Sequence, residues 1–138
     1  MKIKSFNNTS FKKIFKTFSK AFSDYDFQLN EKQLIAMLNR RGFNADLSFA
    51  VFEDNEIVSF TLNGIGNFNE KLTAYDTGTA TIKDYRGQGL ATKVLEYSIP
   101  YLQEANITQY LLEVLQSNTK AISVYKKLGF AKEFIKYI

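Results

Sequence analysis

The chain has 138 residues, 45% of them hydrophobic and 23% charged, with a formal net charge of +4, and this composition predicts one globular domain over residues 1–138. It contains no cysteine and no histidine, which excludes disulfides, thiolate nucleophiles and zinc–thiolate sites and removes the commonest general base. Basic residues are scattered, and no apolar run approaches the ~18 residues of a membrane span, so we expect a cytoplasmic protein without a nucleic-acid, membrane or metal partner.

The first third of the chain has the pattern of a short strand and two helices. Residues 2–6 are predicted to form the strand. Apolar residues then recur every three or four positions between Phe11 and Phe22, which is the spacing of one helix face. A second helix is predicted to begin at Asn30, where Asn30 and Gln33 have the spacing of a capping box, and to end at Gly42.

The period changes to two after Gly42, and strands alternate with helices from there on. Strands are expected at 47–52 and 57–62, joined as a hairpin, followed by a loop over 63–72. The remaining elements are predicted as a strand at 73–82, a helix at 89–105 kinked at Pro100, a strand at 109–115, a helix over 117–128 and a last strand within 131–138. This order predicts a mixed α/β or α+β sheet.

The segment "YRGQGLATK", residues 85–93, lies between a predicted strand and a predicted helix. Two glycines at such a position let the backbone approach a ligand closely, and the first turn of a helix offers unpaired N–H groups that attract phosphate. Arg86, Thr92 and Lys93 can add side-chain contacts. A plain helix-capping turn is the alternative, and a dinucleotide site is a weaker one because Thr92 stands where its third glycine is required.

Two blocks of the sequence resemble the GNAT acetyltransferases. "RGQGLA" at 86–91 matches the glycine-loop signature of that family, and "LLEVLQSNTKAISVYKKLGF" at 111–130 resembles its second block of strand and helix. Both blocks occur in the family's order, and the resemblance extends over essentially the whole chain. It implies a mostly antiparallel central sheet flanked by helices, and an enzyme that transfers an acetyl group from acetyl-CoA to a primary amine of a small molecule or peptide, without a metal.

The resemblance also assigns a cofactor site. Family members hold the CoA diphosphate on backbone amides of the glycine loop, and pantetheine runs beside the preceding strand where this strand and residues 109–115 separate. The residues implied to bind acetyl-CoA are Thr79, Ala80, Thr81, Arg86, Gly87, Gln88, Gly89, Leu90, Ala91, Thr92 and Asn118.

The same resemblance suggests the catalytic groups. Tyr125 matches the family's general acid, and a phenol is suited to protonating a thiolate of similar basicity, although a packed helix tyrosine is the alternative. Glu113 is the first candidate for the general base because burial in an apolar strand would raise its pKa. A solvated or ion-paired Glu113 is equally compatible with the sequence, which leaves Asp76, Asp24 or a water molecule as further candidates.

The chain departs from the family near its C-terminus. Only eight residues follow Phe130, so the last strand of the family's fold is expected to be missing. The acceptor side would then be open, or completed by a second copy of the chain through the C-terminal edge strand. Tyr25, Phe27 and Phe68 belong to segments that border the acceptor cleft in relatives. A non-catalytic acyl-CoA sensor or interaction module is the alternative function.

Overall fold

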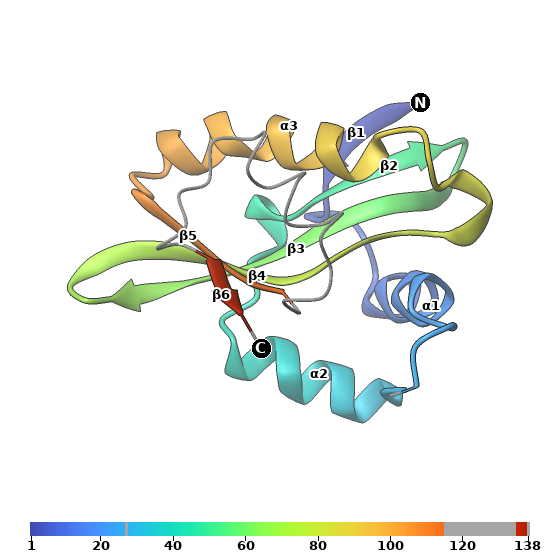
Figure 1. The fold of residues 1–138 in the computed structure, drawn as a ribbon, viewed down its shortest axis with the longest axis horizontal. Helices are drawn as coiled ribbons and strands as arrows, with labels where there is room; N and C mark the ends of the chain where they lie inside the picture. The colour runs from blue at the N-terminus through green and yellow to red at the C-terminus, as the bar shows by residue number, and fades with distance from the viewer. Residues whose placement is uncertain (27, 115–134, 138) are drawn as a thin grey trace.

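The computed structural model describes residues 1–26, 28–114 and 135–137 (Figure 1). Its six described strands form one sheet in the order β1-β2-β3-β4-β5-β6. Neighbouring strands are antiparallel from β1 to β4, whereas β5 is parallel to β4 and β6 is parallel to β5. The elements in chain order are β1 (Lys2–Ser5), α1 (Phe11–Ala21), α2 (Glu31–Arg40), η1 (Ala45–Leu47), β2 (Phe49–Glu53), β3 (Glu56–Phe68), β4 (Lys71–Thr81), η2 (Lys83–Tyr85), α3 (Leu90–Glu104), β5 (Gln109–Val114) and β6 (Ile135–Tyr137).

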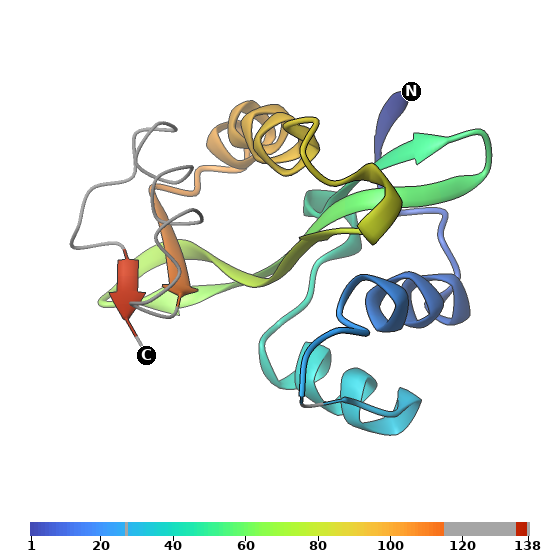
Figure 2. The same cartoon turned by 45° about the vertical axis from the view of Figure 1, so that its right-hand side comes forward.

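The predicted fold class, a mixed and mostly antiparallel sheet flanked by helices, is confirmed. Helix α3 covers one face of the sheet, and α1 and α2 lie on the other (Figures 1 and 2). Leu95 and Leu102 of α3 pack with Ala74 of β4, while Ile14 of α1 meets Phe60 on the opposite face. Each large side chain buried in this way contributes about 1.5–3 kcal/mol, so both layers are held chiefly by apolar burial. None of the described helices is long and apolar enough to cross a membrane.

The two helices below the sheet begin where the sequence predicts. Ser10 caps α1 by accepting a hydrogen bond from the Lys13 amide. Asn30 and Gln33 form the predicted capping box at the start of α2. Gly42 follows the helix with φ of 73°, a left-handed conformation that glycine adopts at little cost, and this explains why α2 stops there.

The loop predicted over 63–72 is wrong. Strand β3 continues to Phe68 and β4 begins at Lys71, so only Asn69 and Glu70, both with positive φ, form the turn. Gly64 suggested a loop, but it serves another purpose. A Cβ atom at Gly64 would lie 1.9 Å from the Arg41 carbonyl oxygen, which means that the end of α2 packs directly on the backbone of β3.

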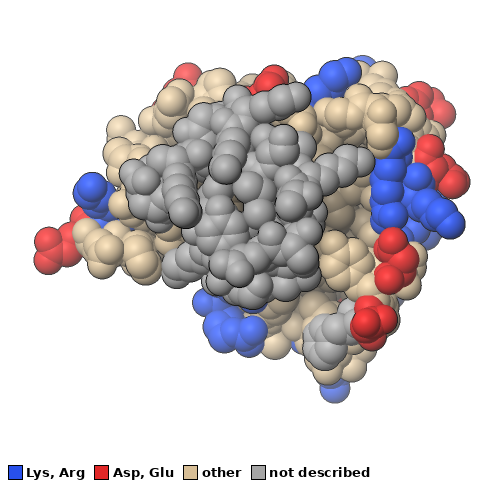
Figure 3. All heavy atoms as spheres, viewed as in Figure 1, with Lys and Arg blue, Asp and Glu red and all other residues tan. Residues whose placement is uncertain are grey.

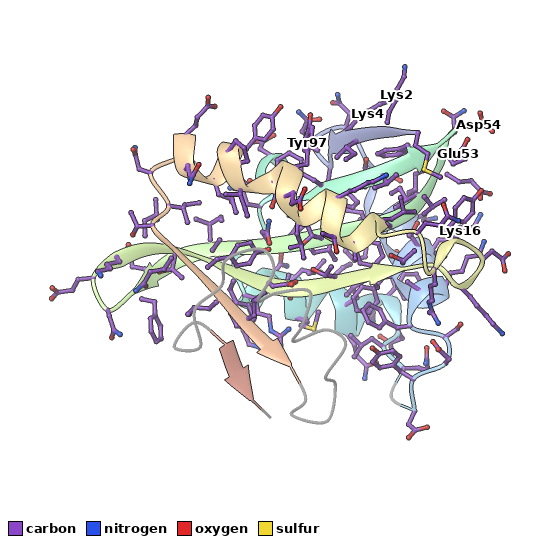
Figure 4. The ribbon with its side chains drawn as sticks, turned by 45° about the horizontal axis from the view of Figure 1, so that its top comes forward. Lys2, Lys4, Lys16, Glu53, Asp54 and Tyr97 are labelled. Carbon is purple, nitrogen blue, oxygen red and sulfur yellow. The ribbon has the colours of Figure 1, made fainter. Side chains whose placement is uncertain are left out.

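Charged side chains occupy the outer edge of the sheet at β1. Lys2 and Lys4 project from this strand, and Glu53 and Asp54 lie at the turn between β2 and β3 (Figure 4). The ammonium group of Lys4 lies 5.2 Å from the centre of the Phe52 ring, so its aliphatic stem covers an apolar part of the edge. Charges on an edge strand disfavour pairing with another sheet, and β1 therefore ends the sheet on this side.

The close contact at Gly64 predicts a large difference between two glycines of the same strand. We expect Gly64→Ala to lower the free energy of unfolding by about 3 kcal/mol or more, because the helix end must move away from β3. Gly66→Ala is the matched control, since a Cβ atom there meets nothing within 4 Å. Urea unfolding of the two variants measures the difference, and equal stabilities would contradict the packing.

Candidate active site

The glycine loop before α3 presents a row of free backbone donors. Gly87 and Gly89 have φ of 83° and 74°, and a Cβ atom at either would meet nothing within 4 Å, so the surface above the loop is open. No side chain caps α3, and the amides from Gly87 to Thr92 donate no hydrogen bond to any described residue. Free amides at the first turn of a helix, together with the positive end of its dipole, attract anions such as phosphate.

Arg86 braces this loop against the rest of the molecule. Its Nε donates to the Thr81 carbonyl oxygen at 2.9 Å, and one terminal nitrogen donates to the Ala21 carbonyl oxygen at 2.9 Å. The other terminal nitrogen forms an ion pair with Asp24 at 3.0 Å. The Arg86 hydrogen bond lowers the pKa of Asp24, so this carboxylate is poorly suited to accept a proton near neutral pH.

Strands β4 and β5 separate soon after they meet. Their pairing covers only Thr73–Tyr75 with residues 109–111, and the last paired residues are Tyr75 and Leu111. Beyond this point β4 continues to Thr81 with β3 on one side and no described strand on the other (Figure 2). Thr79, Ala80 and Thr81, the residues expected to lie beside pantetheine, are in this stretch, which pairs with β3 alone among the described strands. Their free edge leads directly to the glycine loop.

A β-bulge lies where the separation begins. Asn63 pairs with Asp76 and Leu62 with Gly78, which leaves Thr77 as the extra residue in β4. The Asp76 carboxylate accepts hydrogen bonds from the Gly78 amide at 3.0 Å and from the Thr79 hydroxyl at 2.7 Å. Burial raises the pKa of Asp76 to about 6, because its effect exceeds that of the two hydrogen bonds, which lower the pKa. Asp76 thus has the acidity of a general base that works near neutral pH.

Hydroxyl and amide groups continue from Asp76 across the sheet. The Thr79 hydroxyl lies 2.8 Å from that of Thr61, which in turn lies 3.4 Å from the Tyr110 hydroxyl. Tyr110 donates a hydrogen bond to the side-chain oxygen of Asn63. The sequence interpretation missed Thr61, Asn63 and Tyr110. The threonines of the two facing strands were the signal that could have indicated a polar network here. Together they bind β5 to β3 through side chains near the point where β5 leaves β4.

A pocket of about 340 Å³ opens on the α2 side of the separation. Arg41, which the sequence interpretation also missed, donates to the Thr77 hydroxyl at 3.2 Å, and its guanidinium carbon lies 5.5 Å from the centre of the Tyr75 ring. The residues that line the pocket are Asn39, Arg40, Arg41, Gly42, Gly64, Ile65, Gly66, Asn67, Phe68, Thr73, Tyr75 and Leu111. Phe68 therefore lines the same pocket as Tyr75 and Leu111, the last paired residues of β4 and β5.

Several predicted site residues lie outside the described part of the chain. Asn118 and Tyr125 belong to the undescribed range 115–134, and Phe27 is also undescribed. Glu113 is in β5, where its backbone pairs with Lys136 of β6, but its side chain is outside the description. Tyr25 is exposed at 56%, away from the lining of the pocket. The roles assigned to these residues stay predictions.

Comparison with known sequences identifies relatives of the chain. The sequence model of the acetyltransferase (GNAT) family matches residues 11–130. N-alpha-acetyltransferase 30 of Schizosaccharomyces pombe is 36% identical over 61 residues, which are 44% of this chain and 41% of that protein. The ribosomal protein bS18 alanine N-acetyltransferase of Escherichia coli is 29% identical over 90 residues, 65% of this chain and 58% of that protein. The chain thus spans about half the length of these curated relatives.

Solved structures have the same fold. The crystal structure of the ribosomal-protein-S18-alanine N-acetyltransferase from Escherichia coli matches with a TM-score of 0.74 and 25% identity, over 94% of this chain and 77% of that one. The NatC complex bound to Gag peptide and CoA matches with a TM-score of 0.74 and 22% identity, over 95% of this chain and 86% of that one.

The raised pKa of Asp76 predicts how stability depends on pH. A carboxyl group whose pKa is raised in the folded state stabilises the fold below its unfolded pKa, and this stabilisation is lost as pH rises through the folded pKa. Asn mimics the protonated group. Relative to the wild type, Asp76→Asn should therefore gain about 2 to 3 kcal/mol of stability between pH 3.8 and pH 7.

Urea unfolding at a series of pH values measures this difference. Asp46→Asn, which removes an exposed carboxylate, is the control and should follow the wild type. If the stabilities of wild type and Asp76→Asn ran parallel over the whole range, Asp76 would have an ordinary pKa.

Proposed function

Because the chain belongs to the acetyltransferase (GNAT) family, we propose that it transfers the acetyl group of acetyl-CoA to the primary amine at the N-terminus of a peptide or protein. The observation that carries this proposal is the edge of β4 that no described strand pairs with, next to glycine-loop amides that donate to no described residue. The names of the relatives, N-alpha-acetyltransferase and ribosomal-protein alanine N-acetyltransferase, support an N-terminal amine as the acceptor.

The cofactor would bind along this surface. The amides from Gly87 to Thr92 would hold its diphosphate, with Gln88, Leu90 and Ala91 contributing backbone donors between the glycines. The edge of β4 at Thr79, Ala80 and Thr81, which no described strand pairs with, would offer main-chain groups to the amides of pantetheine, as a neighbouring strand does. The Thr81 carbonyl oxygen is the exception, because it accepts from Arg86. Asn118 completes the proposed set. Arg86 supports it by holding the loop against α1 rather than by a free charge.

Acetyl transfer then needs the proton of the amine to be removed. The neutral amine would attack the thioester carbonyl carbon to form a tetrahedral oxyanion, which a backbone amide of the β4 edge would stabilise. Collapse of this intermediate would break the C–S bond. The nitrogen would lose its second proton as the amide forms, and Tyr125 would protonate the thiolate that leaves, so that one proton is lost and one is gained. An α-amine with a pKa of about 7.7–8.0 needs only a weak base, whereas a lysine amine with a pKa of about 10.4 needs a stronger one.

Two carboxylates are candidates for that base. Asp76 has the appropriate pKa, about 6, and lies where β4 leaves β5. Glu113 is in β5, beyond the last pair between the two strands. Either carboxylate would accept the proton of the amine, directly or through a water molecule.

Thermal-shift titration with acetyl-CoA tests the cofactor site. Acetyl-CoA at a hundred times its dissociation constant should stabilise the protein by about 2.7 kcal/mol, and CoA should act similarly, whereas NAD and ATP should not. Gly89→Ala should weaken the effect because alanine disfavours the left-handed conformation of residue 89. A shift produced by NAD alone would overturn the proposed site, and a shift by both CoA species without turnover of any peptide would identify an acyl-CoA sensor.

The pH dependence of catalysis separates the two candidate bases. Replacement of the true base, by Asp76→Asn or Glu113→Gln, should lower kcat/KM by roughly 10²- to 10⁴-fold and remove the acidic limb of the pH profile. If Asp76 is the base, this limb lies near pH 6 in the wild type. The other variant serves as the control and should keep the limb. A limb that survives in both variants would exclude both residues.

A further inference from the structure

Arg41 has no acidic partner among the described residues. It follows the last residue of α2 and is partly buried, yet the one described ion pair of the structure joins Arg86 to Asp24 instead. The contacts of Arg41 are the Thr77 hydroxyl, at 3.2 Å, and the face of the Tyr75 ring. These contacts hold the guanidinium group in place, and no described carboxylate compensates its charge. A partly dehydrated cation of this kind is stabilised when an anion binds beside it.

The described residues around Arg41 bring no negative charge to the pocket. Its described lining contains Arg40 and Arg41 but neither aspartate nor glutamate. Figure 3 shows basic side chains gathered over the C-terminal end of α2, with no acidic side chain next to them on the described surface in that view. The volume of about 340 Å³ is within the range of small-ligand sites, about 300–1,000 Å³. An anionic group would therefore meet both space and favourable charge.

The pocket also lies at the right place to contact an acceptor. Tyr75 and Leu111 are the last paired residues of β4 and β5, and both line the pocket. The pocket thus opens at the point where the two strands separate, which is where the proposed function places the thioester. The bulge residue Thr77, one of the two contacts of Arg41, is next to Asp76 in the chain. A ligand group bound by Arg41 would be near an amine that reacts in the gap.

We propose that Arg41 binds a carboxylate of the acceptor, one or two residues from the acetylated amine, so that the enzyme prefers peptides with an acidic second residue. This inference rests on the proposed function. The planar guanidinium group can form two parallel hydrogen bonds with a carboxylate, and the Tyr75 ring keeps it in one plane. Lysine or arginine at the same peptide position would be repelled by Arg40 and Arg41. The α-carboxylate of a free amino acid has the same chemistry and is the other source to test.

Matched peptides test this proposal by binding as well as by turnover. Peptides that begin Ser-Glu, Ser-Gln and Ser-Lys, otherwise identical, are titrated against the protein saturated with CoA, and kcat/KM is measured with acetyl-CoA. The Glu peptide should bind roughly tenfold or more tightly than the Gln peptide, as expected for a charge-assisted hydrogen bond, and the Lys peptide should bind most weakly. Free serine and serine amide, compared in the same way, show whether an α-carboxylate suffices.

Substitutions in α2 and at Arg41 test whether the preference for the Glu peptide depends on Arg41. Arg41→Gln should abolish the preference for Glu over Gln, and Arg41→Lys, which keeps the charge without the planar fork, should retain part of it. Lys32→Gln removes the same charge from an exposed position of α2 outside the pocket and should leave the preference unchanged. Stabilisation by CoA in thermal-shift experiments verifies that each variant is folded.

The outcomes distinguish this inference from the proposed function. Equal binding of the Glu and Gln peptides, or a preference that survives Arg41→Gln, overturns the role of Arg41 even if both peptides are acetylated. A preference for the Glu peptide that depends on Arg41, found without any acetylated product, supports the carboxylate site and overturns acetyl transfer.

Discussion

The separation of β4 from β5 after Tyr75 is the constraint on which the rest of the site depends. A backbone edge without a partner strand is costly when it is buried, because each N–H and C=O group needs a hydrogen bond. Here the stretch from Thr79 to Thr81 stays at the surface of a gap and is paired on one side only. The same feature would be a liability in an ordinary sheet. Beside a loop whose amides donate to no described residue, it is the surface along which we propose that the cofactor binds.

Polar side chains stabilise the sheet where backbone pairing ends. The chain of contacts from Asp76 through Thr79 and Thr61 to Tyr110 and Asn63 links three strands near the point of separation. Buried polar groups of this kind stabilise the fold when every one of them has a hydrogen-bond partner. No buried side-chain nitrogen or oxygen in the described residues lacks such a partner. The network thus keeps β5 attached to β3 while β4 diverges, and its burial also weakens the acidity of Asp76.

Two arginines beside the site differ in how their charge is compensated. Arg86 is paired with Asp24 and donates to two carbonyl oxygens, so its charge is used within the molecule to fix the glycine loop. Arg41 has a hydroxyl and an aromatic ring as its described contacts, and its charge remains available. A sequence shows both as arginines next to glycine, and only the neighbours that the fold supplies separate a structural arginine from one that can recognise a ligand.

The sequence by itself determined the limits of the described helices and the turn at the glycine loop, because these depend on residues close together in the chain. Capping by Asn30 and Gln33, the end of α2 at Gly42 and the open first turn of α3 follow from local conformational preferences. Other features depend on contacts across the sheet, and only the tertiary structure decided them. Gly64 belongs to a strand because α2 packs on it, the bulge at Thr77 has no local signal, and Asp76 acquires its raised pKa from burial. The fold likewise decides that no described acidic residue pairs with Arg41, since partners distant in sequence determine whether a cation is neutralised.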